Sequence, residues 1–260
     1  MLERALRSIR DGLLGLSYPQ QCRVCGSAVE SWDYGVVCGD CWDDSALTRI
    51  LTSDVCTKCG APGAPPTVNS QVNSTTSRSR ACGNCAPAPF TAARASGIYS
   101  GAFEASILFL KVTPHICPRL RRIICQTFSD HRGALRSDMV IPVPLHRLRK
   151  RQRGFNQAEL IARLISRKFG LTFDDRSLIR IKPTERHRAG MDANDRIQSV
   201  ERAFEVVNSK PIRGASVLLV DDVYTTGSTI CAATLSLTEA GVRQVNVLTI
   251  ARVGVRPMGA

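Results

Sequence analysis

Residues 217–231, VLLVDDVYTTGSTIC, join an apolar run to a polar loop and then to the start of an amphipathic helix. The apolar run at 217–220 predicts a central strand that is buried on both faces. It ends in the adjacent carboxylates Asp221 and Asp222, which are costly to bury unless they meet solvent, a metal or a polyol. Because ligands bind at the carboxyl ends of strands in open α/β sheets, the stretch predicts a binding site.

The loop that follows has the composition of a phosphate-binding turn. The hydroxyls of Thr225, Thr226, Ser228 and Thr229 can donate to phosphate oxygens, and Gly227 lets the backbone turn and approach closely. The helix N-terminus adds unpaired N–H groups and the positive end of a dipole. The two aspartates can accept hydrogen bonds from two ribose hydroxyls. The plainer alternative is an acidic turn followed by a Ser/Thr helix cap.

Elsewhere, runs rich in β-branched residues alternate with helical patterns, which predicts an α/β fold with a mostly parallel sheet and helices on both faces. Strands are expected at residues 96–99, 139–142, 178–181, 217–221 and 244–251. Helices are expected at residues 103–110, 118–130, 156–169 and 229–240. The expected division is a helix at 1–16, a cysteine module at 17–90 and the α/β domain at 91–260. Within the module, residues 61–80 are polar and predict a mobile loop.

The chain has 260 residues and a net charge of +13, with 35 Lys+Arg against 22 Asp+Glu. Such a surplus favours phosphates, nucleic acid or an acidic protein as partners, although it could also serve solubility alone. The sequence contains no apolar run of the roughly 20 residues that a membrane span needs, so membrane insertion is not expected. The helix at 1–16 is interrupted by charges and resembles a docking helix more than a signal peptide, which predicts a cytoplasmic protein.

Eight of the eleven cysteines form four Cys-x-x-Cys pairs. This pattern predicts two structural zinc sites of four thiolates each, because each pair can point two thiolates at one tetrahedral metal. Sequential and crossed pairing are both possible, and iron–sulfur binding is a minor alternative. The module could act as a structural staple or as a docking surface. The expected ligands are Cys22, Cys25, Cys38, Cys41, Cys56, Cys59, Cys82 and Cys85.

The cysteines outside these pairs have a plainer interpretation. Cys117, Cys125 and Cys231 are expected to pack in the core.

A second anion site is expected after the strand at 139–142, where residues 147–157 form a basic segment, RLRKRQRGFNQ. Five basic residues in seven positions repel one another, and a dense anion would relieve that repulsion. Gly154 and Asn156 could offer backbone N–H groups and a helix cap. The alternatives are a solvated basic loop or a binding site for single-stranded DNA.

The string around Asp221 resembles the motif that binds phosphoribosyl pyrophosphate (PRPP) in type I phosphoribosyltransferases. Together with the cysteine pairs and the PVPLH and RGFNQ strings, the chain is similar to the ComF family of competence-associated proteins. The resemblance implies that the aspartates hold the ribose hydroxyls, that residues 225–229 hold the 5′-phosphate, and that Mg²⁺ arrives with PRPP. It places the pyrophosphate, or a DNA phosphate, at Lys111, Arg151, Arg153, Gly154 and Asn156.

The resemblance also predicts a mobile hood over the site, from Lys182 to Phe204. This chain departs from the family pattern there, with His187 where Gln is usual and Ser199 where Asn is usual. His187 could act as a general acid or base, but an exposed loop histidine is the plainer interpretation.

Two functions follow from the resemblance. The first is a PRPP-binding protein that acts in DNA uptake, binding single-stranded DNA beside a competence helicase and recombination proteins. The second is an active phosphoribosyltransferase that moves ribose 5-phosphate from PRPP to an unidentified acceptor. The sequence points to no catalytic residue and identifies no acceptor.

Overall fold

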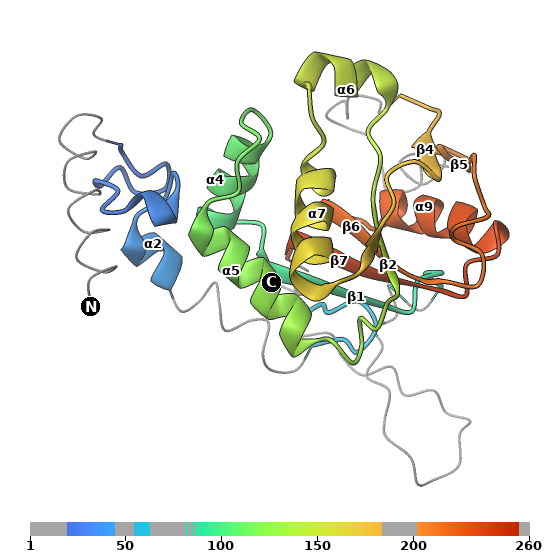
Figure 1. The fold of residues 1–260 in the computed structure, drawn as a ribbon. Coiled ribbons are helices and arrows are strands. Elements are labelled where there is room, and N and C mark those ends of the chain that lie inside the picture. Colours follow the sequence, from blue (N-terminus) through green and yellow to red (C-terminus); the bar gives the residue numbers. More distant parts are fainter. Residues whose placement is uncertain are drawn as a thin grey trace, which may run out of the picture.

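The computed structural model describes residues 20–44, 55–62, 82, 85, 87–183 and 202–254. Its centre is a sheet of five parallel strands in the order β1-β7-β6-β2-β3. Figure 1 shows the sheet between two helical layers. The main-sheet strands are β1 Ala92–Ile98, β2 Met139–Pro142, β3 Thr172–Phe173, β6 Ser216–Tyr224 and β7 Gln244–Arg252. The α/β class with a mostly parallel sheet is therefore confirmed.

Strand β6 lies at the middle of the sheet and is buried on both faces. Residues 217–220 are fully buried. Leu218 and Val220 face one hydrophobic core, and Val217 and Leu219 face the other. The strand runs three residues beyond the predicted end at Asp221, because β7 continues to pair with it as far as Arg252.

The helices on the two faces follow the predicted pattern closely. One face carries α4 (Gly101–Leu110), α5 (Pro118–Asp130) and α7 (Gln157–Phe169), and the other carries α9 (Ser228–Glu239). Helix α5 has the predicted bounds, whereas α4 begins two residues earlier than predicted. Residue Asn156 caps α7, with its side-chain oxygen accepting from the backbone N–H of Ala158 at 3.1 Å.

The basic segment contains a helix that was not predicted from the sequence. Residues Arg147–Arg153 form the helix α6, whose side chains all remain exposed or half-buried. The backbone N–H of Leu148 donates to His146 Nδ1 at 3.4 Å, and Gly154 ends the helix in the left-handed conformation. Arg, Lys, Leu and Gln are good helix formers, and the caps at both ends offset the charge repulsion.

One predicted strand lies outside the main sheet. Strand β4 (Leu178–Arg180) pairs antiparallel with β5 (Phe204–Val206) in a separate two-stranded sheet. Strands β3 and β5 were not predicted, because each is too short to show a period. The predicted helix at 1–16, residues 63–80 of the predicted loop, and the hood positions from Thr184 to Ser199 lie outside the described residues.

The cysteine segments pack in two different places. The first, with the short helices η1 (Trp32–Tyr34) and α2 (Gly39–Asp43), lies against α4 and α5, where the rings of Trp42 and Phe103 meet edge-on at 5.7 Å. The second segment, around Cys56, lies beside β1 (Figure 1), where the N–H of Ala93 donates to the carbonyl of Lys58 at 2.7 Å. Among the described residues, no helix has the length and apolar character to cross a membrane.

Candidate functional site

The phosphate loop, residues 225–229, follows β6 and leads into α9. Gly227 has φ +82°, and a Cβ there would come 2.5 Å from Tyr224 Oη, so glycine alone fits this turn. The hydroxyls of Thr226 and Ser228 lie 2.9 Å apart, and the N–H of Ser228 faces Thr226 Oγ1 at 3.4 Å. The loop thus gathers hydroxyl groups at the N-terminus of a twelve-residue helix, which is a favourable place for an anion.

Asp221 and Asp222 lie side by side at the base of the phosphate loop. The N–H of Asp222 donates to Asp221 Oδ1 at 2.8 Å. Burial raises the pKa of Asp221 well above its usual range, and the charge of Asp222 raises it further, while Arg180 acts in the opposite direction. Two adjacent, half-buried carboxylates can accept hydrogen bonds from the two hydroxyls of a ribose.

A first cavity of about 340 Å³ opens over these carboxylates. It brings together residues from both predicted anion sites. Those residues are Asp221, Asp222, Thr225, Thr229, Lys111, Arg153 and Asn156. The other predicted residues do not line it. They are Thr226, Gly227 and Ser228 of the phosphate loop, and Arg151 and Gly154 at the end of α6.

Sequence reasoning missed four polar residues of the first cavity, namely Tyr99, Arg149, Gln157 and Arg180. Helical spacing could have found Arg149, because residues four apart share a helix face and Arg153 was already a candidate. Tyr99 and Arg180 carry no local signal. Arg180 reaches the cavity because β4 pairs with β5, and its guanidinium lies 5.2 Å from the Phe204 ring centre.

The cations of the first cavity outnumber its carboxylates. Four basic side chains, Lys111, Arg149, Arg153 and Arg180, accompany the two aspartates. Burial lowers the pKa of Arg153, and the charge of Arg149 lowers it further. The charge of Asp222 acts in the opposite direction. This arrangement suits a ligand that carries both hydroxyls and several phosphate charges.

Asn156 already uses its side chain within the protein. Its Nδ2 donates to the carbonyl of Val143 at 3.0 Å, and its Oδ1 caps α7. It therefore fixes the turn between β2 and α6 against α7, at the wall of the cavity.

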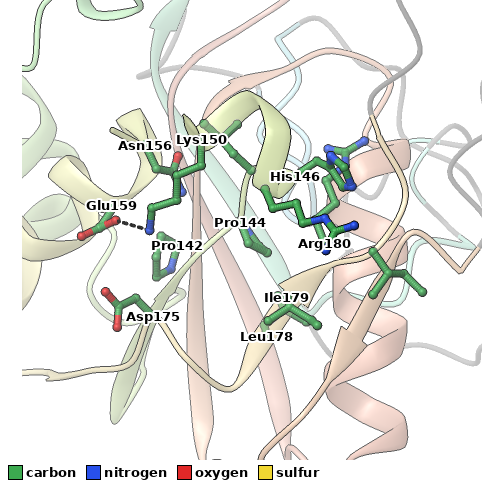
Figure 2. Close-up of a pocket in the computed structure, with 13 residues that line it drawn as sticks. Pro142, Pro144, His146, Lys150, Asn156, Glu159, Asp175, Leu178, Ile179 and Arg180 are labelled. Atoms are coloured by element: carbon green, nitrogen blue, oxygen red, sulfur yellow. Dashed lines mark hydrogen bonds and ion pairs between the residues drawn. The ribbon is translucent and has the colours of Figure 1, made fainter. Parts of the chain in front are cut away.

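A second cavity of about 420 Å³ lies next to the same turn (Figure 2). The two cavities share Pro144, Leu145, Asn156 and Arg180. Its apolar walls come from the ends of β2 and β4. Its polar wall holds the ion pair of Lys150 Nζ and Glu159 Oε2 at 3.5 Å, drawn as a dashed line in Figure 2. Asp175 also lines it.

The paired cysteines gather into two clusters in sequential order. The first cysteine cluster is Cys22, Cys25, Cys38 and Cys41, and the second is Cys56, Cys59, Cys82 and Cys85. Within each cluster the sulfur atoms lie within 4.8 Å of one another, which fits one tetrahedral zinc ion. The pairing left open by the sequence is therefore sequential, and the donor set supports two structural zinc sites.

Backbone amides favour thiolates in the second cluster. The N–H groups of Cys82 and Cys59 face Cys56 Sγ at 3.1 Å and 3.4 Å. Burial opposes ionisation of Cys56, but these hydrogen bonds lower its pKa to about 6. In the first cluster, hydrogen bonds from Ser27 lower the pKa of Cys25 to about 6. Zinc binds the thiolate form, so each cluster holds a cysteine that ionises readily, whereas burial raises the pKa of Cys38, Cys41, Cys59 and Cys85.

Two family models match the chain. A model described as "Double zinc ribbon domain" matches residues 13–86, and one described as "Phosphoribosyl transferase domain" matches residues 155–258. The first spans both cysteine clusters, and the second spans the phosphate loop.

Several curated proteins are similar to this chain. "DNA utilization protein YhgH" of Salmonella typhimurium is 27% identical over 244 residues, which cover 91% of this chain and 99% of that protein. "Competence protein F" of Haemophilus influenzae is 39% identical over 118 residues, covering 44% of this chain and 50% of that protein. "Competence protein ComFC" of Bacillus subtilis is 33% identical over 103 residues, covering 40% of this chain and 39% of that protein.

Proposed function

The chain belongs to the ComF family, and we propose that it binds PRPP in the first cavity and acts in the use of incoming DNA. The observation that carries the proposal is the first cavity itself. It joins Asp221, Asp222 and the phosphate loop to the basic side chains Lys111 and Arg153 within one space. A simple phosphate needs only the loop, whereas PRPP also carries a diol and a pyrophosphate.

Each part of PRPP has a matching group. The ribose hydroxyls donate to Asp221 and Asp222, and the 5′-phosphate accepts from the hydroxyls and N–H groups at 225–229. The pyrophosphate lies toward Lys111, Arg149 and Arg153. Mg²⁺ prefers phosphate and carboxylate oxygens, so it accompanies the pyrophosphate and offsets its charge near the aspartates.

Binding of PRPP is tested by calorimetry with Mg²⁺ present. Wild-type protein is expected to bind PRPP, and inorganic pyrophosphate is expected to compete with it. A protein that binds neither PRPP nor ribose 5-phosphate would contradict the proposal.

The basic helix α6 supports single-stranded DNA as a second ligand. Arg147, Arg149, Lys150 and Arg151 are exposed along it. Arg147 and Lys150 line the second cavity, and Arg149 lines the first. Such a row of cations favours a phosphate backbone over any base sequence, so binding should weaken strongly as salt rises. The names of the relatives, a DNA utilization protein and competence proteins, agree with this role. Fluorescence anisotropy with an oligonucleotide at several salt concentrations tests it, and salt-independent binding would contradict it.

Transfer of ribose 5-phosphate to an acceptor is the second candidate function, and the second cavity favours it. That cavity shares Asn156 and Arg180 with the first and has apolar walls that suit a flat heterocycle. In the reaction, a nitrogen of the acceptor bonds to C1′ of the ribose as the bond to pyrophosphate breaks. Arg153 and Arg149 stabilise the charge that develops on the leaving pyrophosphate. The assay incubates PRPP, Mg²⁺ and candidate bases and measures pyrophosphate release. Intact PRPP binding without release across the bases would favour the binding role.

A further inference from the structure

The phosphate loop rests on a buried tyrosine. Tyr224 ends β6 and is 8% exposed, and its hydroxyl and Cζ would lie 2.5 Å and 2.8 Å from a Cβ at Gly227. Phe90 meets the Tyr224 ring edge-on, with centroids 6.2 Å apart. Because this contact has almost no free space, the position of the tyrosine ring determines the position of the loop.

A buried arginine joins this tyrosine to the second cysteine cluster. Arg252 ends β7, pairs with Tyr224 across the sheet, and is 4% exposed. Its guanidinium lies 5.2 Å from the centre of the Tyr224 ring. Its Nη1 donates to the carbonyl of Cys59 at 2.6 Å and lies 3.8 Å from Cys59 Sγ.

The contact between Arg252 and Cys59 should depend on the metal because of charge. A buried cation is costly unless a compensating negative charge lies nearby. A zinc ion held by these four thiolates would carry a net negative charge, and Cys59, one of its ligands, lies beside Arg252. Without the metal, the four cysteines are no longer held as one cluster, and Arg252 loses the fixed partner that Cys59 provides.

The two cysteine clusters differ in what they support. All four cysteines of the second cluster pack in one hydrophobic core with Phe90, Tyr224 and Ile230, the last of which lies in α9. Cys22 and Cys38 of the first cluster pack instead in the core of α4 and α5. Among the residues that the structure describes, only the second cluster shares a core with Tyr224 and Ile230, which flank the phosphate loop.

We infer that Arg252 and Tyr224 are positioning residues that couple metal binding at the second cysteine cluster to the geometry of the phosphate loop. The inference rests on the proposed function, because the loop is taken to hold the 5′-phosphate. With zinc bound, Arg252 stays in place above Tyr224, and Tyr224 holds Gly227 and the loop. Linkage is reciprocal, so a ligand in the loop must also tighten zinc at this cluster.

The first test compares two arginine variants of the full chain. Arg94 is the matched control, because its Nη2 donates to Thr57 of the same cysteine turn at 2.9 Å, from β1. Metal analysis first verifies that the Arg252→Gln variant retains both zinc ions. In that variant, amide exchange at 225–229 should accelerate and PRPP affinity should fall roughly tenfold. Arg94→Gln with both zinc ions retained should match wild type in both measurements. Equal behaviour of the two variants would overturn the inference.

The second test uses unmodified protein, so it does not depend on whether a variant folds. A chelator removes zinc in the presence and absence of PRPP, and mass spectrometry of alkylated cysteines identifies the emptied cluster. PRPP should slow zinc loss from the second cluster and leave the first unchanged. Equal rates with and without bound PRPP would overturn the coupling.

A failure of the proposed function can be told apart from a failure of the coupling. If wild-type protein binds no PRPP, the proposed function fails. Amide exchange at 225–229 then still decides the coupling, by comparing zinc-loaded protein with protein that has lost only the second zinc. Faster exchange after that loss supports the coupling, and unchanged exchange overturns it.

Discussion

Tyr224 and Gly227 lie so close together that any side chain at position 227 would overlap the tyrosine hydroxyl, which would lie 2.5 Å from the new Cβ. Gly227 also has a φ of +82°, in the region that only glycine enters without strain. The turn of the phosphate loop is therefore fixed by packing against Tyr224 as well as by its own backbone conformation.

Replacing Gly227 with alanine should weaken both the fold and the site. The positive φ alone costs about 1–2 kcal/mol, and the overlap with Tyr224 adds to it. Gly214→Ala is the matched control, because Gly214 has φ +73° with open space where its Cβ would lie. Urea unfolding and PRPP calorimetry should show that Gly227→Ala loses more stability than Gly214→Ala, and that only Gly227→Ala loses affinity. Equal losses in the two variants would contradict this packing account.

The raised pKa of Asp221 predicts a pH-dependent stability. The folded protein holds a proton that the unfolded chain releases above its ordinary pKa of about 3.9. The free energy of unfolding should therefore fall as pH rises from about 4 through the folded-state pKa. Asp221→Asn removes this loss, so the variant should be more stable than wild type at pH 7 and similar to it at pH 4. Urea unfolding of both proteins at pH 4 and pH 7 tests the predicted direction of this stability difference. A variant that is equally destabilised at both pH values would refute the prediction.

Arg149 and Arg151 are exposed on the same helix, but only Arg149 lines the first cavity. Arg149→Gln should weaken PRPP binding about tenfold, in keeping with a charge-assisted hydrogen bond of roughly 1.5 kcal/mol. Arg151→Gln should leave PRPP binding unchanged. Both variants should weaken binding of single-stranded DNA, because each removes one charge that faces phosphates. Loss of PRPP affinity in Arg151→Gln would instead favour the site predicted from the sequence.

The cysteine clusters predict two zinc ions per chain and a specific pairing. Replacing Cys25 and Cys38 together with serine affects one cluster, so about one zinc should remain by metal analysis. Replacing Cys25 and Cys56 together affects both clusters, so almost none should remain. The reverse pattern would indicate crossed pairing, and an iron spectrum would rule out zinc as the natural metal.

The sequence was most informative where a feature depends on consecutive residues. The buried run at 217–220, the cysteine spacing and the helix at Pro118–Asp130 could all be predicted, since local pattern and burial agree there. Helix α6 was missed because its basic residues were interpreted only as an anion site, although its residue types favour a helix.

The rest of the site depends on contacts between distant segments. Arg180 enters the first cavity through pairing with residue 204, and Arg252 reaches Cys59 from the far end of the chain. Neither side chain belongs to a local motif, so only the fold reveals its place. The pairing of the cysteines was likewise ambiguous, because equal Cys-x-x-Cys units allow either order.

Titration of PRPP with Mg²⁺ into wild-type protein and into the double variant Asp221→Ala, Asp222→Ala tests the central claim most directly. The wild type should bind one PRPP per chain, and the double variant should show no measurable heat while it keeps its two zinc ions and its fold. Unchanged affinity in the folded double variant would contradict the assignment of the ribose-phosphate site to the carboxyl end of β6.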